Sequence, residues 1–185
     1  MIKRLFDVAV STTVLLVAAP LMGAIAVAIL LRDGRPIIFR QVRVGQDARP
    51  FEILKFRTML KNAQAIGGIS TAAADPRITP LGRFLRKTSL DELPQLINVL
   101  RGDMSLVGPR PDTPQQERDY SPDDWRARCS VRPGITGLAQ ATMRSSATPE
   151  QRLALDLQYS RNPGLLQDLK ILRKTVAQVF GKGGI

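Results

Sequence analysis

The sequence contains no histidine, a single cysteine (Cys129) and only 5% aromatic residues. The absence of histidine excludes Ser-His-Asp and Cys-His catalysis, a histidine-ligated zinc site and a histidine general base. One cysteine cannot form an intrachain disulfide bond, which fits a reducing compartment. The low aromatic content offers little for stacking bases, so nucleic acid is not an expected partner. Any chemistry must come from carboxylates, Lys, Arg, Tyr and backbone groups.

The chain of 185 residues carries a net charge of +11, at a length that fits one domain plus at most an appendage. Strongly basic surfaces commonly bind nucleic acid, anionic lipid or phosphorylated small molecules. The N-terminal segment favours the last two, because residues 8–31 contain no charged side chain. A straight helix of this length would extend about 36 Å, enough to cross a hydrocarbon core of about 30 Å. A cleaved signal peptide fits less well, because the apolar run is long and continues into basic sequence.

Two details of this segment favour a re-entrant hairpin over a straight span. Pro20 lies near the middle of the apolar run, where a proline removes a helical hydrogen bond and bends the chain. Basic side chains flank the run on both sides: Lys3, Arg4, Arg32 and Arg35. The positive-inside rule would keep both of these ends cytoplasmic. On these residues alone, a straight span and a helix–break–helix hairpin are about equally supported.

The remaining residues predict an α+β fold that is mainly helical with a small β-hairpin. Ile37 begins a short apolar cluster, and residues 51–56 form a second strand-like run. Gly45-Gln46-Asp47 is typical of the turn between them. Residues 62–74 are rich in Ala and Gly and predict a loop or a weak helix.

Helices are expected at residues 81–87, from Pro122 onward, and at residues 165–180. Leu165, Leu169 and Leu172 lie on one side of the last of these helices. This apolar side either packs on the core or lies on the membrane surface, as amphipathic interfacial helices do.

Asp91 and Glu92 are adjacent carboxylates in a strongly basic segment. Ser89 is a good N-cap for a helix that begins at Leu90, with Glu92 in the position of a capping box. In the first turn the helix dipole favours negative charge, so we expect both carboxylates to be ionised. A carboxylate among cations can attack a phosphate or hold a metal ion. The structural alternative is an exposed ion pair of Asp91 with Lys87, which contributes at most about 1 kcal/mol.

Several basic residues are candidates for phosphate binding. Arg110 and Arg132 each occur in a stiff Pro/Gly loop, and the planar guanidinium matches phosphate oxygens. Lys55 and Arg57 follow a predicted strand, and residues at strand ends often face a site. Arg86 lies on a basic helical face, for which simple solvation is the structural alternative.

Three motifs, in this order behind an apolar N-terminal segment, resemble one family over nearly the whole chain. They are KFRTM, DPRITPLGRFLRKTSLDELPQLINVLRGDMSLVGPRP and RPGITGLAQ, which begin at Lys55, Asp75 and Arg132. They resemble the bacterial sugar transferases of the monotopic phosphoglycosyl transferase superfamily, in its small, catalytic-domain-only form. The middle motif is long and specific.

The resemblance implies transfer of a phospho-sugar from a UDP-sugar to undecaprenyl phosphate, with release of UMP. Asp91 would be the nucleophile that forms a phosphosugar-aspartyl intermediate, and Glu92 would help to hold Mg²⁺ or assist the polyprenol phosphate. Arg86 and Arg110 match positions expected near the phosphates. The resemblance also implies a membrane helix broken at a proline, here Pro20, which shifts the balance toward the re-entrant hairpin.

The implied arrangement is a membrane segment of residues 1–35 and a catalytic domain of residues 36–185 on the cytoplasmic face of the bacterial inner membrane. Both termini would be cytoplasmic, and the enzyme would catalyse the first membrane step of polysaccharide or glycoconjugate synthesis. An anionic bilayer is an expected partner. A homodimer and the choice between Mg²⁺ and Mn²⁺ are left open.

Three positions depart from the family pattern. The break is often Ser-Pro, whereas this chain has Ala19-Pro20. Trp often follows RPGITG, whereas this chain has Leu138. An Asn-Gly-Arg often comes next; only Arg144 matches, and it is a further candidate for substrate binding. The rival hypothesis is a non-catalytic, membrane-bound assembly protein whose basic surface binds anionic lipid.

Overall fold

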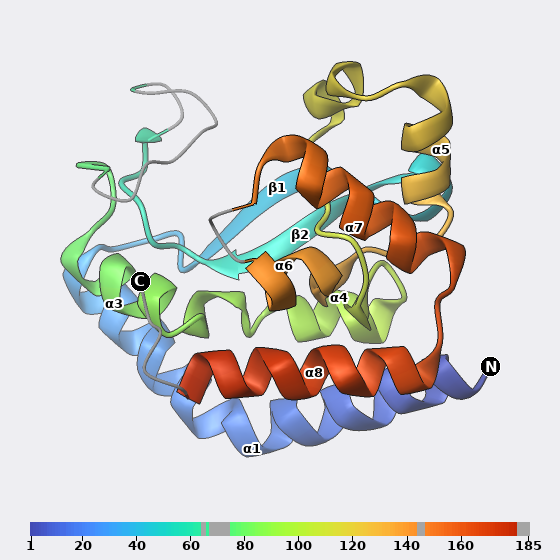
Figure 1. Ribbon diagram of the computed structural model, residues 1–185. Coiled ribbons are helices and arrows are strands. Elements are labelled where there is room, and N and C mark those ends of the chain that lie inside the picture. Colours follow the sequence, from blue (N-terminus) through green and yellow to red (C-terminus); the bar gives the residue numbers. More distant parts are fainter. Residues whose placement is uncertain (64–65, 67–74, 144–146, 181–185) are drawn as a thin grey trace.

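The structure is a computed structural model that describes residues 1–63, 66, 75–143 and 147–180. Within these residues, helices surround two small sheets (Figure 1). The helices are α1 (Ile2–Arg32), α3 (Pro80–Lys87), α4 (Gln95–Arg101), α5 (Pro122–Cys129), α6 (Leu138–Met143), α7 (Pro149–Arg161) and α8 (Leu165–Phe180). The strands are β1 (Ile38–Val44), β2 (Pro50–Phe56), β3 (Ser105–Val107) and β4 (Gly134–Thr136). The short 3₁₀ turns are η1 (Gln46–Ala48), η2 (Leu90–Glu92) and η3 (Pro114–Asp119).

The N-terminal helix α1 is continuous, with Pro20 inside it. The predicted helix–break–helix is therefore wrong in one respect, because a proline removes one hydrogen bond and bends a helix without having to end it. Figure 1 shows α1 changing direction between its N-terminal end and the end beside α3. The helix is long and apolar enough to cross a membrane. Its re-entrant insertion stays a prediction.

Both halves of α1 pack against the rest of the protein. Phe6 and Val10 join a core cluster that contains the fully buried Tyr159. Ile25 and Ile29 belong to a second buried cluster closer to α3. The opposite side of α1 exposes large apolar residues, among them Leu5, Leu16, Val17, Leu21, Val27 and Leu31. The helix therefore lies along the body of the protein, with one packed face and one exposed apolar face. The division between residues 35 and 36 stays a prediction.

The predicted hairpin is confirmed. Strands β1 and β2 pair antiparallel from Ile38 opposite Phe56 to Val44 opposite Pro50. The turn at η1 contains Asp47 with a φ of 54°. A short polar residue adopts this left-handed conformation more readily than most residues, which explains its place in the turn.

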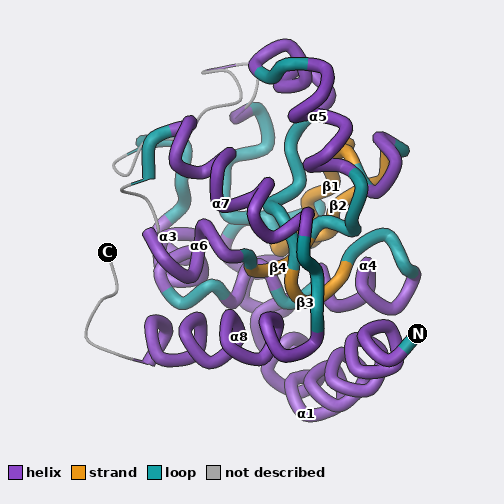
Figure 2. The backbone as a smooth tube through the Cα atoms, turned by 45° about the vertical axis from the view of Figure 1, so that its right-hand side comes forward, coloured by secondary structure: helices purple, strands orange, loops and turns teal. Residues whose placement is uncertain are grey.

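The two Pro/Gly loops of the sequence lie together, because the strands beside them pair. Strands β3 and β4 are parallel, with Ser105 opposite Gly134 (Figure 2). The next residue after β3, Gly108, approaches the other loop so closely that a Cβ would lie 2.2 Å from the carbonyl oxygen of Arg132. A side chain at this position would force the loops apart. The fold thus needs glycine at position 108.

The helix starts were predicted well at two positions and poorly at a third. Helices α3 and α5 begin where expected, with side-chain caps from Thr79 and Ser121. Ser89, in contrast, has a φ of 57° and caps nothing. The acidic pair lies in the 3₁₀ turn η2, and α4 begins only after Pro94. The predicted capping box is therefore wrong.

Helix α8 has the predicted bounds and lies beside α1 in both views (Figures 1 and 2). Its packed side carries Asp168 and Ile171, which are each 1% exposed. Leu169 and Val176 are 45% and 54% exposed, so the predicted apolar side only partly coincides with the buried one. Most of the predicted loop at residues 62–74 lies outside the described residues.

Candidate functional site

Five of the candidate side chains come together from four segments. Asp91 and Glu92 lie on η2, Lys55 on β2 and Arg86 on α3, and Arg110 lies in the loop after β3. The charges of Lys55, Arg86 and Arg110 all act on the Asp91 carboxyl. Residues that are distant in sequence therefore form one cluster of two acids and three cations.

Helix α4 is fixed to strand β2 by Asn98, which is fully buried. Its Oδ1 accepts from the backbone N–H of Leu54 at 3.0 Å, and its Nδ2 donates to the carbonyl oxygen of Glu52 at 2.7 Å. These bonds lie next to Lys55 on the strand. They hold the segment before α4, with the acidic pair, beside Lys55. A buried amide with both ends paired rigidifies such a contact.

Helix α3 approaches the end of β2 through Gly82. A Cβ at this position would lie 2.1 Å from the carbonyl oxygen of Thr58, so only glycine allows the contact. One turn later, the Nε of Arg86 donates to the Oγ1 of Thr58 at 2.8 Å. The KFRTM motif and the helix that precedes the acidic pair therefore support each other.

Glu92 is held by two cations. Its Oε1 accepts from the Nζ of Lys55 at 2.8 Å and from the Nη2 of Arg110 at 3.2 Å. Burial opposes the ionisation of Glu92, but Arg110 and Lys55 outweigh it and lower the pKa to about 2. Burial also lowers the pKa of Lys55, although Glu92 opposes this shift. Glu92 is therefore ionised at neutral pH and holds the side chains of Lys55 and Arg110.

Asp91 differs from Glu92 in its hydrogen bonding and in the direction of its pKa shift. It is 7% exposed, and within the described residues its carboxylate accepts no hydrogen bond and forms no ion pair, so the structural alternative of a pair with Lys87 is not observed. Burial and the adjacent Glu92 raise the pKa of Asp91 to about 6, against the pull of Lys55, Arg86 and Arg110. The predicted helix dipole does not act here, because η2 is a short 3₁₀ turn, and burial raises the pKa instead. At neutral pH a carboxyl with a pKa of about 6 is still mainly ionised. Asp91 is therefore a carboxylate without a hydrogen-bond partner among the described residues, close to the positive charges of Lys55, Arg86 and Arg110.

The acidic pair is connected to the apolar N-terminal helix. Leu90 and Leu93, on either side of the pair, pack against the cluster that contains Ile25 and Ile29 of α1. The acidic pair is therefore flanked by side chains that pack on the same apolar cluster as α1.

The other candidates lie elsewhere. Arg57 is 5% exposed, and its Nη2 donates to the carbonyl oxygens of Asp33 and Gly34 at 2.6 and 2.8 Å, which joins the end of β2 to the end of α1. The Nε of Arg132 donates to the carbonyl oxygen of Gly102 at 2.9 Å. Gly102 ends α4, whereas the acidic pair precedes α4, so Arg132 lies at the other end of this helix. Arg144 lies outside the described residues.

The sequence of this chain matches the family described as bacterial sugar transferase over residues 1–182. The protein belongs to the bacterial sugar transferase family. This assignment covers α1, the acidic pair and both Pro/Gly loops.

Individual relatives of this sugar transferase differ in length. The UDP-glucose:undecaprenyl-phosphate glucose-1-phosphate transferase of Caulobacter vibrioides is 43% identical over 185 residues, which are 96% of this chain and 69% of the relative. The uncharacterized sugar transferase EpsL of Bacillus subtilis is 40% identical over 187 residues, which are 100% of this chain and 90% of the relative. The undecaprenyl-phosphate galactose phosphotransferase of Salmonella typhimurium is 41% identical over 198 residues. The chain is 99% covered by that match but spans only 41% of the Salmonella protein.

Sequence reasoning missed a group of buried charges around Arg128 in this sugar transferase. Arg128 is 4% exposed and pairs with Asp112 and Asp156 at 2.6 and 3.0 Å. No local pattern marks this group, because its members are joined only by the tertiary fold. Asn98 gave a usable signal, since it is a polar residue inside the apolar run LINVL.

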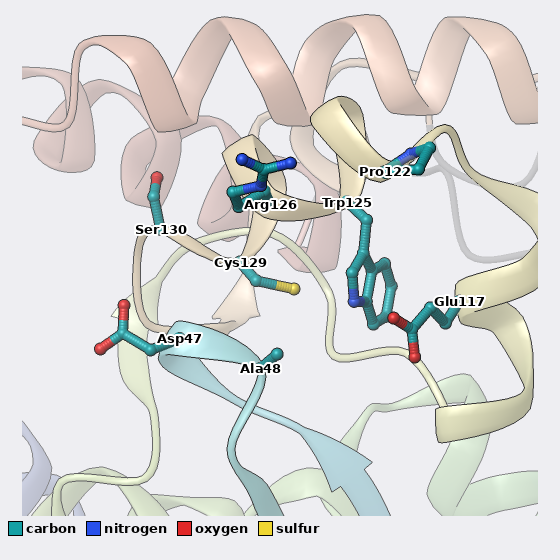
Figure 3. Close-up of a pocket in the computed structure, with 8 residues that line it drawn as sticks. All are labelled: Asp47, Ala48, Glu117, Pro122, Trp125, Arg126, Cys129 and Ser130. Atoms are coloured by element: carbon teal, nitrogen blue, oxygen red, sulfur yellow. The ribbon is translucent and has the colours of Figure 1, made fainter.

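A pocket of the sugar transferase, with a volume of ≈ 520 Å³, lies between η1 and α5 (Figure 3). Neither Asp91 nor Glu92 is among the described residues that line it. Trp125 and Cys129 point into this pocket from α5. Burial raises the pKa of the Cys129 thiol to about 11, so it is protonated at neutral pH and is a poor nucleophile.

Whether Asp91 and Glu92 could hold a metal ion depends on which of their carboxylate oxygens have no other partner. No cluster of three or more metal-binding side chains exists among the described residues. Magnesium needs no such cluster, because it is commonly held by one or two carboxylates together with phosphate oxygens and water. Lys55 and Arg110 both occupy Oε1 of Glu92, and Asp91 is unengaged. Two carboxylates and a diphosphate substrate thus suit Mg²⁺.

Proposed function

We propose that this sugar transferase is a phosphoglycosyl transferase that moves a phospho-sugar from a UDP-sugar to undecaprenyl phosphate and releases UMP. The observation that carries the proposal is the contrast between Asp91, which is unengaged, and Glu92, which is held by Lys55 and Arg110. The Caulobacter and Salmonella relatives are named for glucose 1-phosphate and galactose phosphate transfer with undecaprenyl phosphate. Both names support the reaction type and leave the sugar open.

In the first step, a carboxylate oxygen of Asp91 attacks the phosphorus atom that carries the sugar. The new bond joins Asp91 to the phosphosugar, and the bond between this phosphorus and the oxygen of UMP breaks. UMP leaves with the electron pair of that bond. Lys55, Arg86 and Arg110 would stabilise the negative charge that spreads over the phosphate oxygens, as preorganised cations do in other phosphoryl transfers.

In the second step, a phosphate oxygen of undecaprenyl phosphate attacks the same phosphorus. The bond to Asp91 breaks and its carboxylate is regenerated, while the phosphosugar leaves on the lipid carrier. One cationic pocket serves both steps, because both displacements occur at the same phosphorus atom beside Asp91. The two-step route therefore needs no second site.

Glu92 has a different role from Asp91. Since its pKa is lowered to about 2, it does not accept a proton at neutral pH. It instead fixes Lys55 and Arg110 beside Asp91, and its second oxygen is available to a metal ion. Mg²⁺ held by Asp91 and Glu92 would neutralise charge on the diphosphate.

The contacts of α1 support a position on one face of the membrane. At its start, Lys3 binds Asp168 at 2.5 Å and Asp7 binds Ser105 at 2.9 Å. At its end, the carbonyl oxygen of Asp33 accepts from Arg57. A helix that crossed the hydrocarbon core would place its ends on opposite faces, about 30 Å apart. Both ends of α1 instead bind one polar body, which supports a helix that lies in one leaflet with both ends cytoplasmic.

The test of the proposal is UMP release from a panel of UDP-sugars by the protein in lipid nanodiscs, with undecaprenyl phosphate and Mg²⁺. We expect release with at least one donor, and product that partitions into organic solvent with the lipid. The same panel without Mg²⁺, in the presence of a chelator, tests the metal. The position of α1 is tested separately, by labelling an Ile2→Cys variant in cells from the periplasmic side, where no reaction is expected.

The rival function, a non-catalytic lipid-binding assembly protein, predicts the opposite result. Protein that is folded in nanodiscs would then release no UMP from any donor. Labelling of Ile2→Cys from the periplasm would overturn the one-face arrangement but leave the reaction intact.

A further inference from the structure

Helix α5 has two faces with different partners. On one face Trp125 and Cys129 pack against Val44 of β1, and the Trp125 ring lies 5.3 Å from that of Tyr120. Figure 3 shows this face at the pocket beside η1. The other face carries Arg128 into the body of the protein, where it is 4% exposed. Apolar packing therefore fixes the helix, and the helix fixes the position of Arg128.

All three nitrogen atoms of the Arg128 guanidinium bind carboxylates. Nη1 pairs with Oδ2 of Asp112 at 2.6 Å, and both Nε and Nη2 reach Oδ2 of Asp156 at 3.0 Å. The charged group also lies over the ring of Tyr120, 5.5 Å from its centre. The Tyr120 hydroxyl donates to Asp112 at 2.8 Å. A lysine could not reproduce these contacts, because a single ammonium lacks the planar fork.

Arg128 also reaches the loop that carries Arg110. Its Nη2 donates to the carbonyl oxygen of Arg110 at 2.6 Å. The next two carbonyl oxygens of this loop are held as well, Pro111 by Nη1 of Arg43 at 3.1 Å and Asp112 by the backbone N–H of Val44 at 2.9 Å. The backbone carbonyl oxygens of three consecutive residues are therefore all bound. The side chain of Arg110 reaches Glu92 at 3.2 Å.

We propose that Arg128 is a positioning residue for phosphate transfer, which holds the backbone of Arg110 so that its guanidinium stays beside Glu92 and Asp91. The proposal rests on the proposed function, because it assigns Arg128 a part in that reaction. The side chain of Arg110 is 45% exposed, and Glu92 is its one side-chain hydrogen-bond partner among the described residues, so its position also depends on how its backbone is held. A long side chain that is ordered in advance loses less entropy when the substrate phosphate binds.

The test is a double-mutant cycle in turnover between Arg128→Lys and Arg110→Ala. Arg128→Lys alone should lower kcat/KM between about 10- and 100-fold, the range expected when a catalytic group shifts by a fraction of an ångström to one ångström. In the Arg110→Ala background, Arg128→Lys should cause no further loss of kcat/KM. Thermal unfolding, measured on the same proteins, should show an equal loss of stability in both backgrounds.

The matched control is Arg126→Lys on the same helix, whose side chain is 77% exposed and pairs only with Asp123 among the described residues. It should leave kcat/KM and thermal unfolding unchanged. An equal fold-loss from Arg128→Lys in both backgrounds would overturn the proposal, because a purely structural role acts whether or not Arg110 is present. An unchanged kcat/KM in Arg128→Lys would overturn it as well.

Two further measurements keep the proposal testable if a variant or the proposed function fails. If Arg128→Lys does not fold, Asp156→Asn replaces it in the cycle. This change weakens the ion pair that holds Arg128 and keeps the side-chain volume at position 156. If the wild type releases no UMP, the proposed function fails. Amide hydrogen exchange then tests whether Arg128 holds the backbone of the Arg110 loop.

Exchange in residues 106–113 should be faster in Arg128→Lys than in Arg126→Lys, while the exchange rates in α4 should be the same in both variants. Equal exchange in this segment would contradict the role.

Discussion

Buried carboxylates in two regions of this protein differ in their hydrogen bonding. Asp7 and Asp168, where α1 meets the body, are 2% and 1% exposed, and both accept hydrogen bonds from the side chains around them. Asp91 is 7% exposed and accepts none from the described residues. Similar burial therefore goes with different hydrogen bonding. The difference lies in whether the carboxylate oxygens themselves accept hydrogen bonds from the surrounding donors.

The structural group is satisfied on every side. Asp168 accepts from the hydroxyl of Tyr159 at 2.7 Å and from the Nζ of Lys3 at 2.5 Å. Asp7 accepts from the Oγ of Ser105 at 2.9 Å and from the backbone N–H of Leu106 at 3.2 Å. Such pairing stabilises a buried charge, and its loss leaves unpaired groups behind. The variants below test this contrast, beginning with the largest expected effect.

Asp91→Asn should remove the reaction and leave the protein folded. An amide is a poor nucleophile and cannot form the phosphosugar ester, so turnover should fall at least about 10⁴-fold, as for other covalent nucleophiles. UMP release in nanodiscs measures the effect. The control is Asp123→Asn, whose side chain is 94% exposed and should not affect turnover. Substantial activity in Asp91→Asn would mean that another group attacks the donor.

Lys55→Met should lower turnover by about 10²- to 10³-fold, the usual loss when one preorganised charged donor is removed. The side chain keeps its length, but Glu92 loses the bond of 2.8 Å and retains only Arg110. Kinetics with the preferred donor measure the change in kcat/KM. Lys87→Met on the exposed side of α3 is the matched control. Similar losses in both variants would indicate that general surface charge, and not this pair, supports the reaction.

The difference in unfolding free energy between the wild type and Asp91→Asn should depend on pH in a defined direction. The folded pKa of Asp91 is about 6, raised by burial from an ordinary value of 3.8. Folding therefore favours the protonated form, and its stabilising contribution, full below about pH 4, is lost as pH rises through about 6. Above that range the Asn variant should unfold with a free energy up to about 3 kcal/mol higher than the wild type. Denaturant titrations at about pH 4 and pH 8 measure this. A variant less stable than the wild type at pH 8 would show that Asp91 is structurally engaged.

Asp7→Ala should have the opposite effect on stability. It leaves the Ser105 hydroxyl and the Leu106 N–H without an acceptor in a buried place, which costs about 2 kcal/mol. Thermal unfolding in detergent measures the loss, and Asp7→Asn, which retains an acceptor, should lose less. If Asp7→Ala unfolds like the wild type, the start of α1 is not fixed to the body as described.

Local signals in the sequence predicted most of the elements. Gly45 and the flanking apolar runs fixed the hairpin, and Thr79-Pro80 and Ser121-Pro122 fixed two helix starts. Lys55 and Arg110, predicted as phosphate-binding residues from their place at a strand end and in a stiff loop, both bind Glu92, and their role stays a prediction. All of these signals act within a few residues, so they do not depend on the rest of the fold.

Tertiary contacts decided what the sequence could not predict. Ser89 is a residue type that often caps helices, but the chain turns there, and Leu90 and Leu93 pack on the apolar cluster that contains Ile25 and Ile29 of α1. On α8 the buried side includes Asp168, because Lys3 and Tyr159 pair with it from distant segments. The raised pKa of Asp91 has the same origin, since burial comes from the surrounding elements and not from its neighbours in sequence.

The central claim is that Asp91 carries the phosphosugar between donor and acceptor. It is tested most directly by intact-protein and peptide mass spectrometry after incubation with the preferred UDP-sugar and Mg²⁺ in the absence of undecaprenyl phosphate. We expect one equivalent of UMP at most and the added mass of one phosphosugar on the peptide that contains Asp91, removed again when undecaprenyl phosphate is supplied. An unmodified protein that releases UMP only when both substrates are present would contradict the claim and indicate direct transfer.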